Sequence, residues 1–174
     1  ESRGLGDVYK RQDLSHLIAF QSEHVAAFHL ERQTLHRLPV PRNPTGVERT
    51  AVAHDGRVAL SHLPGGPAIW DPRRDEAMRL LEVSGYPRSL AFAPRGDRLA
   101  IGFQDTTIRL WNTETRRPTV HVGRGHKHAV TDLAWMPDGK RLVSVSLDRS
   151  VRAWDGNTLE ARGTLHGHQS LSLI

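Results

Sequence analysis

The chain has 174 residues, of which 37% are hydrophobic and 25% are charged, a composition typical of one globular domain with its own core. It contains no cysteine and only short apolar runs, which excludes disulfides, thiolate nucleophiles, cysteine-based zinc sites and a membrane-spanning helix. Its net charge of +5 arises from 24 basic residues, most of them arginines, that are scattered instead of forming a stripe, which disfavours a nucleic-acid partner.

Residues 1–12, ESRGLGDVYKRQ, show neither the periodicity nor the turn residues of the chain that follows. They also lack the apolar stretch of a signal peptide. Because this segment resembles a translated library-adapter sequence, we interpret it as a non-native leader and expect it to lie outside the fold. The last five residues, SLSLI, are a candidate for a shorter case of the same kind.

Residues 13–84 contain weak copies of a pattern that becomes clear later in the chain. LIAFQSEHVAAFHLERQ (17–33) parallels LAIGFQDTTIRLWNTET (99–115) with one residue deleted. Trp70 precedes Trp111 by 41 residues, and a turn at 54–56 stands at the corresponding place in its unit. We therefore expect the later part of one repeated unit at 13–42 and a complete unit at 43–84.

Residues 88–112 align with residues 131–155 at a shift of 43, with nine identities in twenty-five positions. Chance would produce about one or two, so these segments are repeats. In the second copy, alternating residues predict strands at 130–135, 141–146, 150–154 and 159–165, separated by turns such as Pro137-Asp138-Gly139.

Four antiparallel strands in about 43 residues make one blade of a β-propeller. The sequence thus predicts an all-β chain of about four four-stranded antiparallel blades in an incomplete ring. The expected units are 13–42 (partial), 43–84, 85–124 and 125–166, and residues 167–174 are expected to begin the next blade.

The second copy carries several residues with a characteristic spacing, namely Gly125-His126, Pro137-Asp138-Gly139, Ser144, Asp148 and Trp154-Asp155. This combination resembles a complete WD40 repeat, and the resemblance extends over residues 14–169, strongly for 86–169. WD40 repeats build β-propellers whose loops bind other proteins, so the resemblance implies the same fold and class of function here.

The resemblance also implies a buried hydrogen-bonded tetrad of His126, Ser144, Asp148 and Trp154. Such a network would satisfy an aspartate and an indole that would be costly to bury alone. The preceding blade keeps Asp105 and Trp111 of this set, but Ile101 replaces the serine and Val83 stands near the histidine position. Its tetrad is therefore expected to be broken.

Neither a catalytic nor a metal site is predicted. Ser144, His126 and Asp148 match the residue types of a catalytic triad, but a tetrad serine would be buried away from substrate. His126 and His168 occupy the Gly-His position of successive repeats, which indicates a structural role, and His128 is then a loop residue. No cofactor is expected.

The resemblance assigns partner binding to loops at one end of the blades. There it places a net basic set, which we call the loop face: Arg88, Gln104, Thr106, Arg124, Lys127, His128, Leu147 and Arg149. We expect this face to bind a protein or peptide, with arginine contacting carboxylate or phosphate groups.

The sequence therefore predicts a non-catalytic, cytoplasmic scaffold for protein–protein interaction that does not enter a membrane. Two alternatives stay open, namely an accessory propeller domain of a larger kinase- or protease-fused enzyme and a nucleic-acid-binding propeller. Since the outer strands of an incomplete ring expose unpaired backbone, we also expect the chain to self-associate.

Overall fold

The computed structural model describes residues 8–10, 16–21, 24–29, 33–39, 49–61, 66–71, 74, 79–81 and 83–167. In these residues it contains sixteen strands and no helix. The strands form four antiparallel sheets of four, and within each sheet they lie in chain order. The predicted all-β fold of four-stranded antiparallel blades is confirmed.

The first two sheets come from the N-terminal half of the chain. The first contains β1 (Val8–Lys10), β2 (His16–Gln21), β3 (His24–His29) and β4 (Thr34–Pro39). The second contains β5 (Thr50–Val52), β6 (Val58–Leu60), β7 (Ala68–Trp70) and β8 (Arg79–Leu80).

The last two sheets are formed by the two clear repeats. The third contains β9 (Pro87–Phe92), β10 (Arg98–Phe103), β11 (Ile108–Asn112) and β12 (Pro118–Gly123). The fourth contains β13 (Val130–Trp135), β14 (Arg141–Ser146), β15 (Ser150–Asp155) and β16 (Ala161–His166). The strand predicted from residue 159 begins at residue 161, because Leu159 has a positive φ of 55° and belongs to the preceding turn.

Strand β1 lies inside the segment that we interpreted as a non-native leader outside the fold. It nevertheless pairs antiparallel with β2, with Tyr9 opposite Ile18. Strand pairing uses backbone groups that nearly every residue carries, so it is compatible with either a native or a foreign origin of residues 8–10. Residues 1–7 and 168–174 lie outside the described residues.

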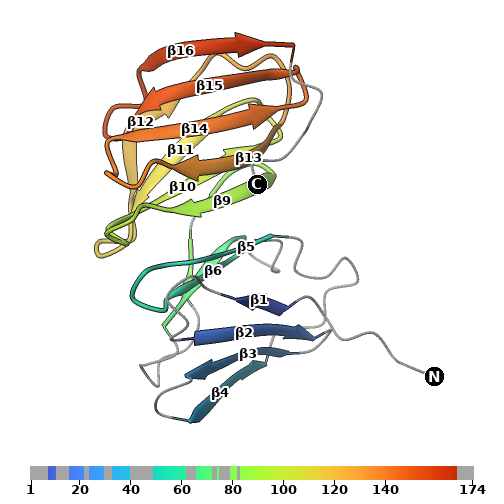
Figure 1. Cartoon of the computed structure of the whole chain (residues 1–174), viewed down its shortest axis with the longest axis vertical. Coiled ribbons are helices and arrows are strands. Elements are labelled where there is room, and N and C mark those ends of the chain that lie inside the picture. The colour runs from blue at the N-terminus through green and yellow to red at the C-terminus, as the bar shows by residue number, and fades with distance from the viewer. Residues whose placement is uncertain are drawn as a thin grey trace, which may run out of the picture.

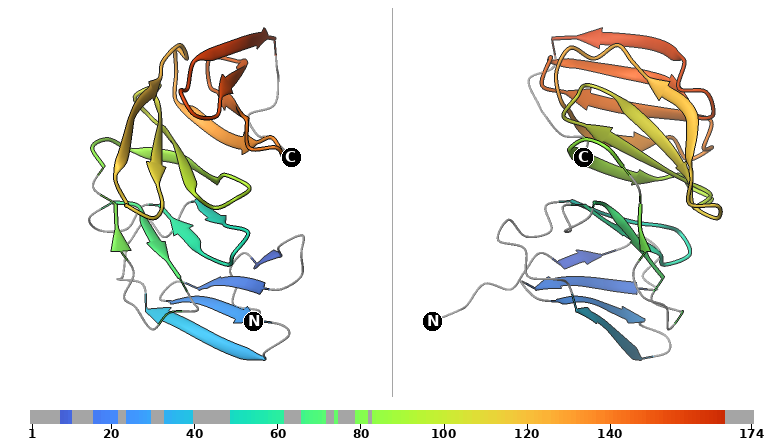
Figure 2. Two further views of the ribbon diagram at one scale, coloured as in Figure 1. Left: turned by 90° about the vertical axis from the view of Figure 1, so that its left-hand side faces the viewer. Right: turned by 180° about the vertical axis from the view of Figure 1, so that it is seen from behind.

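The four sheets follow one another in chain order along the molecule (Figures 1 and 2). The first strands of successive sheets are the ones that meet, since β9 contacts both β5 and β13. The last strands, β12 and β16, each pair on one side only. The turns between strands lie at the two ends of each sheet, and those between the first two strands of the third and fourth sheets accept hydrogen bonds from an arginine of the preceding sheet.

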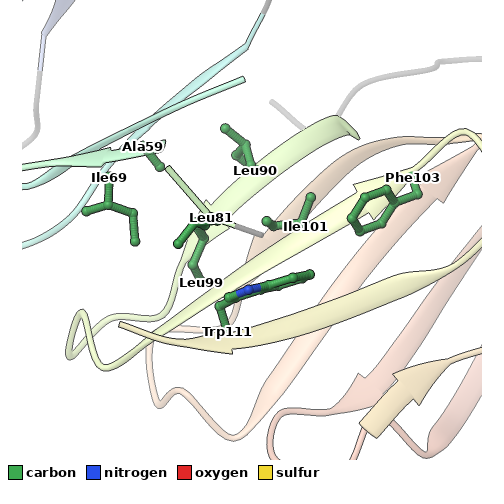
Figure 3. Close-up of a cluster of buried hydrophobic side chains, with 8 residues drawn as sticks. All are labelled: Ala59, Ile69, Leu81, Leu90, Leu99, Ile101, Phe103 and Trp111. Atoms are coloured by element: carbon green, nitrogen blue, oxygen red, sulfur yellow. The ribbon is translucent and has the colours of Figure 1, made fainter. Parts of the chain in front are cut away.

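Packing between successive sheets forms two hydrophobic clusters. Side chains of the second and third sheets make up the first, including Ile69, Leu99, Ile101 and Trp111 (Figure 3). Those of the third and fourth sheets, including Trp154, make up the other. Because alternate residues of a strand point to opposite faces, the third sheet contributes to both clusters and is buried on both sides.

Gly102 lies at a close approach of the third sheet to Val130 of the fourth sheet. A Cβ atom at this position would collide with the Ser89 hydroxyl and would stand 2.7 Å from Cγ1 of Val130. Both neighbours are fully or nearly fully buried, so neither can move aside freely.

We predict that Gly102→Ala lowers the free energy of unfolding by about 1–3 kcal/mol, because the added methyl group overpacks this contact. The matched control is Gly163→Ala in β16, where an added Cβ would have no atom within 4 Å. Urea unfolding followed by tryptophan fluorescence measures both changes, and equal midpoints for the two variants would contradict the close-packing argument.

Candidate binding face

The four tetrad residues lie in one buried network in the fourth sheet. The Trp154 indole N–H donates to Oγ of Ser144 at 2.7 Å, and Oγ of Ser144 lies 2.6 Å from Nε2 of His126. Nδ1 of His126 lies 3.0 Å from Oδ2 of Asp148. The network therefore runs from the packed indole to the carboxylate in the turn between β14 and β15.

The proton positions in this network follow from its donors. The Ser144 hydroxyl accepts from Trp154, so its own hydrogen is available for Nε2 of His126. The other nitrogen, Nδ1, then carries the hydrogen that is donated to Asp148. All four side chains are satisfied when the imidazole is neutral and the carboxylate is charged.

Asp148 is the centre of the local hydrogen bonding. Its Oδ1 accepts from the hydroxyl and the backbone N–H of Ser150 at 2.6 and 2.9 Å, and its Oδ2 accepts from the Lys127 N–H at 2.7 Å. Burial raises the pKa of Asp148, but hydrogen bonds from Ser150, Lys127 and His126 outweigh it and hold the pKa well below 3.8. The carboxylate thus ties the loop before β13 to the β14–β15 turn.

Ser150 is a fifth member of the network that sequence reasoning missed. Its hydroxyl also lies 3.1 Å from Nδ1 of His126, and its side chain is buried. The aligned repeat has Thr107, whose hydroxyl bonds Asp105 at 2.5 Å in the same way. A hydroxyl residue two positions after the aspartate in both repeats was the available signal.

Burial lowers the pKa of His126, Asp148 raises it, and the positive charge of Arg152 lowers it, so that it lies below its ordinary value of 6.5. Burial and the guanidinium of Arg152 therefore favour the neutral imidazole. Gly125, which precedes this histidine, has a φ of +150°, a backbone conformation that favours glycine.

The third sheet holds its aspartate by a different route. Nη2 of Arg109 pairs with Oδ2 of Asp105 at 2.5 Å, and Thr107 donates to Oδ1. Burial raises the pKa of Asp105, but the hydrogen bonds from Thr107 and the positive charge of Arg109 lower it by more. The pKa of Asp105 therefore lies below its ordinary value of 3.8. The indole N–H of Trp111 is buried without a hydrogen-bond partner, because Ile101 replaces the serine.

The loop-face residues lie at one end of the third and fourth sheets, in turns and loops except for Arg88, which lies in β9. Arg124, Lys127, His128, Arg149 and Gln104 are exposed, whereas Arg88, Thr106 and Leu147 are half-buried. The loop before β13 is joined to the β14–β15 turn by backbone as well as side-chain bonds, including the Leu147 N–H to the Ala129 carbonyl at 3.0 Å. In the third sheet, Arg88 donates to Oε1 of Gln104 at 2.7 Å.

Tyr86 lies beside the loop-face residue Gln104, although it was not among the residues predicted from the sequence. It precedes β9, its carbonyl accepts from the Gln104 N–H at 2.8 Å, and 60% of its surface is exposed. Its aligned counterpart, Ala129, is buried and small. An aromatic residue at a loop position where the other repeat has alanine was the signal that could have identified it.

Within the described parts of the chain, no group of three or more His, Asp or Glu side chains is placed to hold a metal ion. No helix in those parts has the length and apolar character needed to cross a membrane.

We predict that Ser144→Ala lowers the free energy of unfolding by about 1–3 kcal/mol, because the Trp154 indole and Nε2 of His126 both lose a buried partner. Thr115→Ala, which removes an exposed hydroxyl from the β11–β12 turn, is the control and should have little effect. Chemical denaturation measures both, and an unchanged midpoint for Ser144→Ala would argue against an energetic role of the network.

The lowered pKa of His126 predicts a loss of stability as pH falls below 6.5. In this range the unfolded chain binds a proton at His126 more readily than the folded chain does, so the free energy of unfolding decreases as pH falls. His126→Gln should remove this part of the slope below pH 6.5, whereas the exposed-site variant His128→Gln should keep it. Thermal unfolding across this range is the measurement, and identical slopes for all three proteins would refute the assignment.

Comparisons with known proteins agree with this architecture. A family model, the WD domain, G-beta repeat, matches residues 80–112 and 117–155. Protein hir-1 of Neurospora crassa is 34% identical over 150 residues, and Protein HIR1 of Gibberella zeae is 35% identical over 147 residues. Each match covers 74% of this chain and 14% of the relative.

A chain in the crystal structure of the Mitotic Checkpoint Complex superposes with a TM-score of 0.77 at 22% identity. The match covers 96% of this chain and 52% of that one, so this chain spans about half of its structural neighbour and a smaller share of the curated relatives. The repeated sequence, the four-stranded sheets and these matches together show that the chain belongs to the WD40-repeat β-propellers.

Proposed function

We propose that the chain is a protein-interaction scaffold that binds an acidic segment of a partner through its loop face. The observation that carries this proposal is the set of exposed cations on the fourth sheet. Arg124, Lys127 and Arg149 are exposed, and none of them forms an ion pair with a described residue. The carboxylate beside them, Asp148, points inward and is already saturated with hydrogen bonds.

The backbone that carries these cations is fixed by a hydrogen bond and by turn geometry. Lys127 is held by its backbone bond to Asp148, and Arg149 is the next residue after that aspartate in the turn. Arg149 also has a positive φ of 65°, a conformation that fixes the direction of the turn. The backbone of Lys127 is thus tied to the turn that carries Arg149, which lowers the entropy lost when a partner binds.

The third sheet extends this surface with a different chemistry. Arg88 is oriented by its bond to Gln104, and Tyr86 presents an exposed ring beside them. Aromatic and arginine side chains are the residue types that contribute most to binding at protein interfaces. The surface therefore combines charges that attract carboxylates with an aromatic anchor that can contact an apolar residue of the same partner.

The two sequence-based alternatives lead to different expectations. An accessory propeller of a larger enzyme would also bind an acidic partner through this face. That alternative therefore leaves the proposed binding contacts unchanged. A nucleic-acid-binding propeller would show a steep loss of affinity with salt, because each phosphate contact releases a counterion.

We predict that Lys127→Glu combined with Arg149→Glu weakens binding of a short fluorescein-labelled Glu/Asp-rich peptide at least about tenfold, because two attractive contacts become repulsive. Fluorescence anisotropy at fixed salt is the measurement. The matched control, Arg116→Glu with Arg117→Glu, makes the same charge change in the β11–β12 turn at the opposite end of the sheet. It should bind like the unaltered chain.

Equal losses in the two double variants would show that only net charge matters and would remove the loop-face assignment. Tighter binding of an oligonucleotide than of the acidic peptide, with a steep salt dependence, would favour the nucleic-acid alternative instead.

A further inference from the structure

Arg152 is a half-buried arginine of β15 whose guanidinium has no acceptor. It forms no hydrogen bond or ion pair with a described residue. Its Nε is buried without a hydrogen-bond partner, whereas its Nη1 and Nη2 retain exposure to solvent. Together with burial, its positive charge lowers the pKa of His126, so this charge lies close to the tetrad. Because a partly buried charge without an acceptor costs free energy, an acceptor that reached this guanidinium would be stabilising.

The other half-buried arginines in the part of the chain that the structure describes all have acceptors. Arg57, Arg98 and Arg109 each form an ion pair with an aspartate. Arg88 donates to the side-chain oxygen of a glutamine. Half-burial of an arginine is therefore accompanied by an acceptor at every described position except that of Arg152.

The aligned repeat shows which acceptor an arginine at this position uses. Arg109 is the counterpart of Arg152 at the shift of 43, and its Nη2 pairs with Oδ2 of Asp105 at 2.5 Å. The counterpart of that aspartate, Asp148, is engaged by His126 and by backbone N–H groups, and it forms no ion pair with Arg152. In the fourth sheet the tetrad histidine thus takes the place of the arginine beside the aspartate, and the guanidinium is left without a carboxylate.

The surroundings of Arg152 are suited to a carboxylate from another molecule. Arg152 lies opposite the exposed Thr164 in the β15–β16 pair, so the two side chains share one face of the sheet. Its Nη1 lies 2.8 Å from the position that a Cβ of Gly125 would occupy, which places the guanidinium against the loop before β13. That loop carries Arg124 and Lys127 of the loop face, so a segment bound there can extend to Arg152.

We propose that Arg152 and Thr164 form a carboxylate-binding site at the margin of the loop face, which an aspartate or glutamate side chain of the acidic partner occupies. The guanidinium supplies a fork of N–H donors that matches a carboxylate, and the Thr164 hydroxyl supplies a further donor. The inference rests on the proposed function for the source of the carboxylate. The site itself consists of strand residues outside the loop face, so it can be tested separately.

Acetate is the probe for the site itself. The Nε–Hε NMR signal of Arg152, assigned by its absence from Arg152→Gln, should shift progressively as sodium acetate replaces sodium chloride at constant ionic strength. The signal of Arg109 should stay in place, because that guanidinium already holds Asp105. Thr164→Val should weaken acetate binding about threefold, since one hydrogen bond to a charged group is lost. An unmoved Arg152 signal, or an equal shift of the Arg109 signal, would overturn the proposal.

Peptide binding tests the occupant of the site. Arg152→Gln should weaken binding of the fluorescein-labelled Glu/Asp-rich peptide at least about threefold, because one charge-assisted contact is lost. Arg152→Lys should have a smaller effect, since lysine keeps the charge but lacks the planar fork. The matched control is Arg116→Gln, which removes one positive charge at the opposite end of the third sheet and should leave the affinity unchanged.

The variants separate a failure of this site from a failure of the proposed function. Weaker peptide binding after Lys127→Glu with Arg149→Glu, but not after Arg152→Gln, would overturn the carboxylate site and leave the loop face in place. Weaker binding after Arg152→Gln alone would support the site and overturn the loop-face proposal. Equal losses after Arg152→Gln and Arg116→Gln would show that only net charge matters, and the site would be rejected.

Discussion

The burial of a sheet on both of its faces is the constraint on which the rest of this structure depends. In β10, Leu99 and Ile101 pack toward the second sheet, and Ala100 packs toward the fourth. Gly102 lets the third and fourth sheets approach closely. Since the faces between neighbouring blades are occupied, recognition depends on loops at the ends of the strands, such as those of the loop face.

The tetrad connects this packing to the loop face. Trp154 is anchored in the cluster between the third and fourth sheets, and the chain of hydrogen bonds through Ser144 and His126 ends at Asp148 in the turn. Through this chain of hydrogen bonds, the position of Lys127 in the loop face depends on a tryptophan in the core. In the third sheet, Arg109 replaces the histidine as partner of the aspartate, so the turn is held although the indole of Trp111 is left unpaired.

Much of this arrangement was predictable because it depends on local chemistry. The strands of the fourth sheet follow alternating apolar residues, and their turns follow Pro-Asp-Gly and aspartate patterns. Other contacts were not predictable, because they join residues whose distance apart in the sequence says nothing about contact. The hydrogen bonds from Arg57 to the Gly96 carbonyl and from Arg98 to the Gly139 carbonyl are of this kind.

The sequence by itself determined the repeat and the strands of each clear unit, since these follow from periodicity and turn residues, and its resemblance to WD40 repeats implied the tetrad residues. Only the tertiary structure decided which side chains bridge one blade to the next. Arg57, Arg98 and Arg141 look equivalent in sequence, yet the first two are largely buried against an aromatic ring and the third is exposed. The physical reason is that a guanidinium finds its partners in the neighbouring sheet, and the position of that sheet is set by the packing of whole faces.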